Sequence, residues 1–188
     1  VMEGIRRAEE EGLDPIKINV VLIEGLNDDE ITDFGRLSLE SPYHIRFIEY
    51  MPLGGTARGG PLRHVADDVV KARLETLGKL EPVENLPLDG PAQRFRFAGA
   101  RGEIGFISAL SHHFCHACNR MRLVPSGRLR PCLLSDVEED LKTPLRRGAS
   151  DEELARIFLK AAKKKPASHG LAAETLLSVS GQMSDIGG

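Results

Sequence analysis

Apolar and polar residues in the first part of the chain follow the pattern of a βαβ unit. The first dozen residues show the helical spacing of apolar side chains and stop at Gly12. The near-continuous apolar run 16–23 is typical of a strand buried on both faces, and the mostly apolar segment 44–51 predicts a second strand. Between them, the amide and acidic residues that open segment 27–40 predict a helix. Two strands joined by one helix predict a parallel sheet or barrel.

The pattern changes after residue 51. The stretch 52–63 is rich in Gly and Pro and predicts a boundary loop. A helix is expected at 64–77, followed by antiparallel strands at 93–97 and 103–107, where apolar and polar residues alternate. These segments predict a region that is built differently from the βαβ unit.

Two further helices are predicted from capping-box patterns, in which a serine is followed three residues later by a glutamate. The pairs are Ser135 with Glu138 and Ser150 with Glu153. The second of these helices ends in the lysine run 163–165. We expect these lysines to be solvated charges, which are favourable at the C-terminus of a helix.

The composition is that of a folded globular protein without a strongly charged surface. Of the 188 residues, 41% are hydrophobic, and the formal net charge is −3. So small a charge does not indicate a surface for nucleic acid or membrane. No apolar stretch has the length of a membrane span and the N-terminus lacks the pattern of a secretory signal, so the cytoplasm is the expected location.

Cys115, Cys118 and Cys132 carry the strongest chemical signal of the sequence. They are too few for a disulfide framework, and the C-x2-C pair predicts a metal centre that is held by one tight turn. The third cysteine returns to the pair after a predicted hairpin. Spacing alone leaves open an iron-sulfur cluster, a structural zinc with a histidine as fourth ligand, or a cysteine that is only a small buried apolar residue. The neighbouring histidines are His112, His113 and His116.

Arginines flank these cysteines. Arg120 and Arg122 follow the C-x2-C pair and share one face of a predicted strand, and Arg128 and Arg130 precede the third cysteine. A structural zinc needs no such residues, whereas guanidinium groups bind phosphate through forked, charge-assisted hydrogen bonds. The pattern favours an anionic ligand beside the metal centre, although Arg128 and Arg130 also fit exposed arginines on a hairpin. A 4Fe-4S cluster held by only three thiolates leaves one iron open, and that vacancy permits substrate binding.

Taken together, these motifs resemble the GTP 3′,8-cyclase family, radical-SAM enzymes of molybdenum cofactor biosynthesis. The C-x2-C-x13-C spacing with Asn-Arg-x-Arg after the second cysteine is highly specific, and the resemblance covers essentially the whole chain. The segments that carry it are 17–21, 25–28, 45–52, 105–108, 111–123, 127–133 and the final Gly187-Gly188.

The resemblance implies an α/β fold. Residues 1–55 would be the last strands and helices of an incomplete (β/α)6 radical-SAM barrel, and residues 56–188 an α+β extension that binds an iron-sulfur cluster and GTP. The family's SAM-side 4Fe-4S cluster is held by a CxxxCxxC motif, which this sequence lacks. The chain is therefore expected to be the C-terminal part of a longer enzyme and to be inactive alone. The implied reaction converts GTP to (8S)-3′,8-cyclo-7,8-dihydroguanosine 5′-triphosphate through a radical derived from S-adenosylmethionine.

The resemblance also implies roles for individual residues. Cys115, Cys118 and Cys132 would hold the second 4Fe-4S cluster, which binds GTP through its open iron. The other implied roles are GTP contacts for Arg120 and Arg122, triphosphate contacts for Lys17 and Arg46, a SAM contact for Met51, and a place in the catalytic machinery for Gly187 and Gly188.

The implied partners are small molecules and one further enzyme. They are GTP, S-adenosylmethionine and the cyclic pyranopterin monophosphate synthase that would receive the product, and a homodimer is a compatible oligomeric state. The alternative function, argued from the residues alone, is a zinc-stabilised module that binds nucleotide or RNA phosphate.

Overall fold

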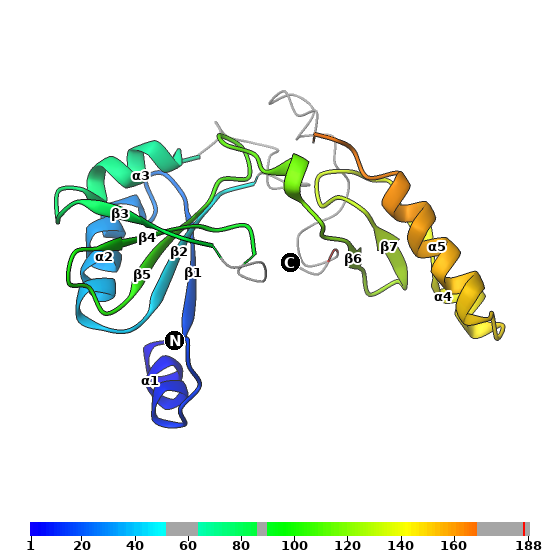
Figure 1. The fold of residues 1–188 in the computed structure, drawn as a ribbon, viewed down its shortest axis with the longest axis horizontal. Helices are drawn as coiled ribbons and strands as arrows, with labels where there is room; N and C mark the ends of the chain where they lie inside the picture. Colours follow the sequence, from blue (N-terminus) through cyan, green and yellow to red (C-terminus); the bar gives the residue numbers. More distant parts are fainter. Residues whose placement is uncertain (52–63, 86–89, 169–185, 187–188) are drawn as a thin grey trace. The chain divides into compact units, whose positions relative to one another are not determined.

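The structure, a computed structural model, describes residues 1–51, 64–85, 90–168 and 186. Contacts divide these residues into two units. The first unit contains the described residues of 1–51 and 64–113, and the second contains those from 114 onward. The first unit is a five-stranded mixed sheet with helices, and the second is a three-stranded sheet with two helices (Figure 1).

The sheet of the first unit has the strand order β1-β2-β5-β4-β3. Strand β1 (Lys17–Leu22) is parallel to β2 (His44–Glu49), and β2 is parallel to β5 (Glu103–Ile107). Strand β4 (Gln93–Phe97) pairs antiparallel with β5 and with β3 (Leu80–Val83). A parallel half and an antiparallel half therefore meet at β5 (Figure 1).

Among the described residues, three helices and a short 3-10 turn belong to the same unit as this sheet. Helix α1 (Met2–Glu10) has no buried residue, and its Glu9 accepts a hydrogen bond from the Tyr43 hydroxyl at 2.6 Å. A short 3-10 turn (Asp28–Glu30) leads into α2 (Ile31–Glu40), which contacts β2, β5 and helix α3 (Asp67–Leu74). Helix α2 is thus the crossover that makes β1 and β2 parallel.

The core of the first unit lies on one face of its sheet. Ile45 and Phe47 of β2 are buried, and they stand in register with Ile104 and Phe106 of β5. The rings of Phe47 and Phe106 are stacked with centroids 6.2 Å apart. The residues of β2 that alternate with these, such as Arg46, are half-buried on the opposite face, which leaves that face available for polar side chains.

The second unit is built on a hairpin. Strands β6 (Arg122–Leu123), β7 (Arg128–Arg130) and β8 (Glu139–Asp140) form an antiparallel sheet in that order. A 3-10 turn (Cys115–Ala117) precedes β6. Helix α5 (Asp151–Lys163) contacts β7, β8 and the short helix α4 (Lys142–Arg146), as Figure 1 shows.

The predicted helices and strands agree with the structure where each follows from the apolar spacing within one short segment. The helix that stops at Gly12, the strands near 16–23 and 44–51 with their intervening helix, and the antiparallel pair β4–β5 are confirmed. The expected burial of β1 on both faces is wrong, because Lys17, Asn19 and Val21 are exposed. The observed sheet is consistent with the predicted mixed α/β class, and the partial barrel stays a prediction.

Two predictions after residue 51 differ from the structure. Strands β3–β5 extend the sheet of β1 and β2, so residues 64–113 lie with the first unit and not with the predicted region 56–188. No helix begins at Ser135, whose hydroxyl accepts from the Val137 amide at 3.2 Å. The capping prediction at Ser150 is confirmed, because its Oγ accepts from the Glu153 amide at 3.3 Å.

Candidate functional site

Lys17 and Arg46 lie on the polar face of the first unit's sheet, where they line one pocket. The pocket has a volume of about 160 Å³ and is bounded by β1, β2, β4 and β5. The polar side chains that line it are Lys17, His44, Arg46, Arg94 and Glu103. The structure therefore brings the two residues expected to contact the triphosphate together, and it adds Arg94 to them.

Gly105 makes room for Arg46 in this pocket. The two residues are register partners in the parallel pair β2–β5. A Cβ at position 105 would lie 3.2 Å from Arg46 Cγ and 3.4 Å from Ala92 Cβ, tighter than ordinary contact with the first of these. The missing side chain thus lets the stem of Arg46 lie across β5.

Glu103 is a buried acid that organises the basic residues of the pocket. Its carboxylate accepts from Arg94 Nε at 2.8 Å, Arg94 Nη2 at 2.9 Å and Arg96 Nη2 at 2.5 Å. His44 Nδ1 lies 3.6 Å from Glu103 Oε2. Burial opposes ionisation of Glu103, yet the hydrogen bonds from Arg94 and Arg96 outweigh it and hold the pKa below its ordinary value.

His44 lies beside Glu103, and its surroundings favour the neutral imidazole. Burial lowers the pKa of His44, although the Glu103 carboxylate acts in the opposite direction and the Arg94 charge adds to the lowering. One acid thus stands among several cations in the pocket, which suits an anionic ligand such as phosphate.

A second polar network lies at the C-terminal end of β2, just before Met51. Glu49 is 1% exposed. Its carboxylate accepts from the Leu110 amide at 2.7 Å, from the Ser111 amide at 3.0 Å and from the Ser111 hydroxyl. His64 Nε2 lies 3.3 Å from Glu49 Oε1. Burial raises the pKa of Glu49, but the hydrogen bonds from Ser111 and Leu110 prevail, so the net shift is downward.

Asp67 lies beside this network, and its pKa is raised whereas that of Glu49 is lowered. Its carboxylate accepts from the Ser108 hydroxyl, and its side chain is buried. Burial raises the pKa of Asp67 to about 6, against the hydrogen bond from Ser108 and with the charge of Glu49. Glu49 thus holds the main chain at Leu110 and Ser111, and Asp67 holds the side chain of Ser108, just before the cysteine segment. Met51 itself is half-buried.

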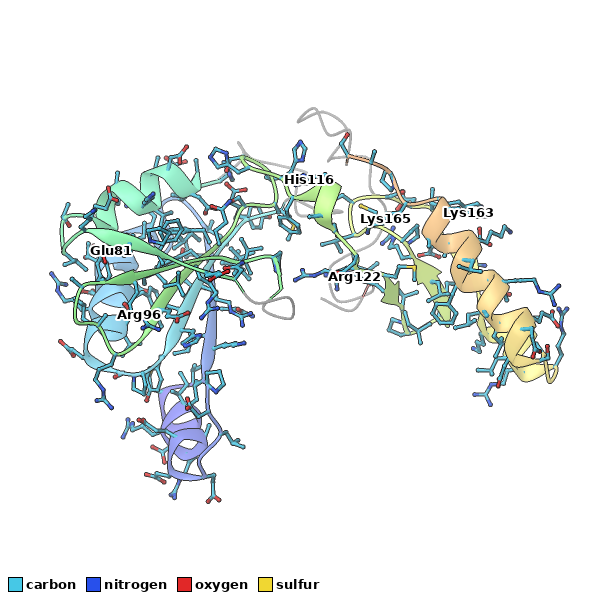
Figure 2. All side chains as sticks on the ribbon, viewed as in Figure 1. Glu81, Arg96, His116, Arg122, Lys163 and Lys165 are labelled. Carbon is cyan, nitrogen blue, oxygen red and sulfur yellow. The ribbon has the colours of Figure 1, made fainter. Side chains whose placement is uncertain are left out.

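In the second unit, Cys115 and Cys118 occupy one tight turn, as predicted. The Cys118 amide donates to the Cys115 carbonyl at 3.2 Å, and the Ala117 amide donates to the Phe114 carbonyl at 3.1 Å. Both thiols and that of Cys132 are free and half-buried. His116 lies in the same turn (Figure 2).

The predicted hairpin between the second and third cysteines is present. Arg122 pairs with Arg130 in the β6–β7 ladder, and the turn closes with the Gly127 amide donating to the Val124 carbonyl at 2.8 Å. Gly127 has φ +83, and a Cβ there would lie 2.5 Å from Lys142 Cβ, so glycine is required. Because the ladder is antiparallel, the chain segments that carry Cys118 and Cys132 leave it at the same end.

Lys165, just beyond α5, joins those two segments. Its ammonium donates to the Arg120 carbonyl at 2.7 Å and to the Pro131 carbonyl at 2.8 Å. The neighbouring Lys163 and Lys164 are exposed, and Lys164 also pairs with Glu139 Oε1 at 2.5 Å. The expectation that the lysine run 163–165 is solvated charge is therefore wrong for Lys165, which is half-buried.

The arginines of the second unit divide into two kinds. Arg122 is half-buried; burial lowers its pKa, and the charges of Arg120 and Arg130 lower it further. Arg130 is 2% exposed, and its Nη2 donates to Asp136 Oδ1 at 2.5 Å. Its Nε and Nη1 are buried without a hydrogen-bond partner among the described residues. Arg128 is exposed and lies 3.8 Å from Glu138 Oε2, so the surface interpretation fits Arg128 but not Arg130.

The donor chemistry of this segment fits an iron-sulfur cluster. Three free thiols stand on one turn and one adjoining strand end, and Lys165 holds the peptide segments beside two of them together. Within the described ranges, no three His, Cys, Asp or Glu side chains are gathered closely enough to hold a metal ion. The assignment of Cys115, Cys118 and Cys132 as ligands therefore stays a proposal. Gly187 and Gly188 lie outside the described residues.

Sequence reasoning missed Glu49, Arg94, Glu103 and Lys165. Glu49 and Glu103 lie in strands whose other residues are apolar or alternate between apolar and polar. An acid at such a position only weakly indicates a buried polar contact. The partners of Glu49 and Lys165 lie far away in the sequence, and Arg94 and Glu103 meet across two neighbouring strands, so no local pattern reveals these contacts. In the described part of the chain, no helix is long and apolar enough to cross a membrane.

Known proteins similar to this chain come from one group of enzymes. The chain is 52% identical to a GTP 3′,8-cyclase of Moorella thermoacetica over 90% of its own length and 52% of that protein. It is 48% identical to a GTP 3′,8-cyclase of Heliobacterium modesticaldum, over 100% of the chain and 58% of the relative. A GTP 3′,8-cyclase of Listeria monocytogenes is 41% identical over 92% of the chain and 51% of the relative.

These matches cover a similar share of each relative. The chain spans about half the length of the curated relatives it matches. The family model described as Molybdenum Cofactor Synthesis C matches residues 43–171, which include β2, the pocket side chains of β4 and β5, and the whole cysteine segment. On this match, which covers most of the chain, the protein belongs to the Molybdenum Cofactor Synthesis C family.

Proposed function

We propose that this chain supplies the GTP-binding part of a GTP 3′,8-cyclase of molybdenum cofactor biosynthesis. The observation that carries the proposal is the convergence of Arg120, Arg122 and Arg130 beside free cysteines, in a chain 52% identical to a GTP 3′,8-cyclase. Arg122 is the register partner of Arg130 and Arg120 lies two residues before it, and burial together with the charges of Arg120 and Arg130 lowers the pKa of Arg122. A cluster of cations that repel one another is stabilised by an anionic ligand.

Cys115, Cys118 and Cys132 would hold a 4Fe-4S cluster. Bound there, the cluster would supply one iron with an open position to which GTP can coordinate. Arg120 and Arg122 would orient the nucleotide through charge-assisted hydrogen bonds. Arg130, fixed by Asp136 at 2.5 Å, would keep β7 in register and add positive potential behind Arg122.

Lys17 and Arg46 would bind the triphosphate from the pocket of the first unit. Glu103 orients Arg94 there, and Gly105 leaves space for Arg46. Met51 would contact S-adenosylmethionine, and the Gly187-Gly188 tail would complete the active site. These roles, the transfer of product to cyclic pyranopterin monophosphate synthase, homodimer formation and a cytoplasmic location extend the proposal.

Anaerobic reconstitution of the chain tests the metal centre. We expect one 4Fe-4S cluster per chain, with broad absorption near roughly 400 nm and about four iron and four sulfide. One equivalent of zinc and a colourless protein would instead support the zinc-stabilised phosphate-binding module. The metal content therefore separates the two functions directly.

Substitution of Arg120 or Arg122 by Ala tests the nucleotide site. Each change should weaken GTP binding by about 1.5 to 3 kcal/mol, the scale of a lost hydrogen bond to a charged group. The matched control is Arg128→Ala, because Arg128 is exposed in the same hairpin. The measurement is titration calorimetry on cluster-loaded protein, with the iron content checked for each variant. Equal affinities for all three variants and wild type would remove the nucleotide role.

A further inference from the structure

Lys165 makes a contact whose position suits a specific task. The residue follows α5 (Figure 2). Its ammonium donates to two main-chain carbonyls, one before β6 and one after β7. The acceptors are Arg120 O at 2.7 Å and Pro131 O at 2.8 Å. One nitrogen atom thus holds two chain segments side by side.

Both acceptors stand next to proposed cluster ligands. Arg120 is two residues after Cys118, and Pro131 immediately precedes Cys132. The β6–β7 ladder ends with the pair Arg122–Arg130, so Arg120 and Pro131 lie just beyond its last main-chain pairing. Lys165 supplies a cross-link at the end of the hairpin where the ladder stops and the cysteines begin.

Helix α5 is firmly held on the same small sheet. Ser150 caps its N-terminus, and Ala161 near its C-terminus is 0% exposed. Lys160 and Lys164 both pair with Glu139 of β8, at 2.8 Å and 2.5 Å. These contacts fix the C-terminal end of the helix, and so they also fix the position of the main chain that carries Lys165.

The charge of Lys165 adds to a region that is already positive. Arg122 is the register partner of Arg130 in the β6–β7 pair, and Arg120 lies two residues before Arg122. Asp136 and Glu138 contact Arg130, whereas Lys165 donates to carbonyl dipoles, which compensate an ammonium only in part, so a further anion beside Lys165 is favourable. A cluster bound to three thiolates carries net negative charge and is such an anion.

We infer that Lys165 is a positioning residue that holds the Cys118 and Cys132 segments together and sets its ammonium beside the bound cluster. The inference rests on the proposed function, because it requires a cluster at these cysteines. The cross-link slows loss of the cluster, since both segments must separate for the iron to leave. The ammonium stabilises the reduced cluster, which carries one more negative charge, and so raises the reduction potential.

The experiment compares Lys165→Met, which removes the charge and the donors at similar length, with Lys165→Arg, which keeps both. Lys163→Met is the matched control, because Lys163 is an exposed lysine at the end of the same helix. The full 188-residue chain is reconstituted anaerobically. The readouts are iron and sulfide content, the rate of bleaching by an iron chelator, and the midpoint potential from a redox titration followed by EPR.

Lys165→Met should lose its cluster at least about fivefold faster than Lys163→Met. Its one-electron reduction equilibrium should shift about tenfold toward the oxidised state, a midpoint lower by about 59 mV. Lys165→Arg should restore most of both properties. Equal bleaching rates and equal potentials for Lys165→Met and Lys163→Met would overturn the inference.

Two controls keep these outcomes interpretable. If Lys165→Met does not fold, as shown by circular dichroism, Lys165→Gln replaces it and is compared with Lys163→Gln by the same readouts. If the wild-type chain binds no iron-sulfur cluster, the proposed function itself fails, independently of any variant. Failure of the inference alone would appear as a normal wild-type cluster with no specific effect at position 165.

Discussion

Replacing Asp67 with Asn should remove a loss of stability that sets in as pH rises from about 4 to 6. Asp67 is 6% exposed, and burial raises its pKa from 3.8 to about 6. In that interval the unfolded chain has released the proton and the folded chain still holds it. The contribution of the protonated form is therefore complete below about pH 4 and is lost as pH rises through the folded value. At about 1.4 kcal/mol per pKa unit, the loss is at most about 3 kcal/mol.

Urea unfolding followed by circular dichroism, between pH 4 and 7.5 at constant ionic strength, measures this effect. Relative to wild type, Asp67→Asn should gain up to about 3 kcal/mol in unfolding free energy across the interval, since Asn stays neutral. Its amide oxygen can still accept from Ser108. Asp68→Asn is the control, because the Asp68 side chain is 79% exposed and pairs with His112 on the surface. Parallel wild-type and Asp67→Asn curves would refute the reasoning.

Three further predictions concern the pocket, the reaction and the tail. Glu103→Ala should lower the unfolding free energy by about 3 kcal/mol, because it leaves Arg94 without its forked acceptor. The control is Glu81→Ala, which changes an exposed acid in the same sheet and should cost under about 0.5 kcal/mol by the same urea assay. Equal effects of the two changes would contradict the prediction. The 188-residue chain, which lacks a CxxxCxxC motif, should release no 5′-deoxyadenosine from S-adenosylmethionine, as chromatography can verify. In a complete enzyme, deletion of Gly187 and Gly188 should abolish cyclised product while iron content and melting temperature stay unchanged; wild-type turnover would argue that the tail is dispensable.

Local periodicity accounts for the part of the fold that sequence reasoning predicted. The segments that became β1, α2 and β2 each carry one clear period, and neighbouring elements in the chain are also neighbours in space. Strand β3 escaped prediction because it is only four residues long and contains Pro82. The parallel pairing of β5 with β2 also escaped it, since alternation in a strand does not identify its second partner.

Tertiary contacts explain the false helix at Ser135. The sequence has the required serine and glutamate, but Glu138 faces Arg128 and Arg130 of β7, at 3.8 Å from each. Those ion pairs, together with the neighbouring strand β8, hold the segment in an extended path. A capping box is a local preference, and contacts with another strand overrode it here.

The candidate site was predicted as residue types and only partly as an arrangement. The C-x2-C turn and the hairpin follow from spacing, and the placement of Lys17 and Arg46 at one site follows from the family resemblance. Glu103 and Lys165 do not, because each acts on residues in other elements. Figure 2 labels Arg96 and Glu81, which are register partners in the β3–β4 pair. Arg96 donates to Glu103 at 2.5 Å, and the sequence offers no rule that selects that partner.

The position of β5 between two halves of the sheet has a kinetic consequence. Strands β1 and β2 form through contacts near in sequence, as do β3, β4 and β5, whereas the β2–β5 pairing joins His44 to Glu103. Closing so long a loop costs entropy before the pairing compensates it. Folding of the first unit should therefore end with two preformed pieces docking along β2–β5, as a slow phase of milliseconds to seconds. Gly105 lies on that seam, so a side chain there would hinder the last step of folding as well as the placement of Arg46.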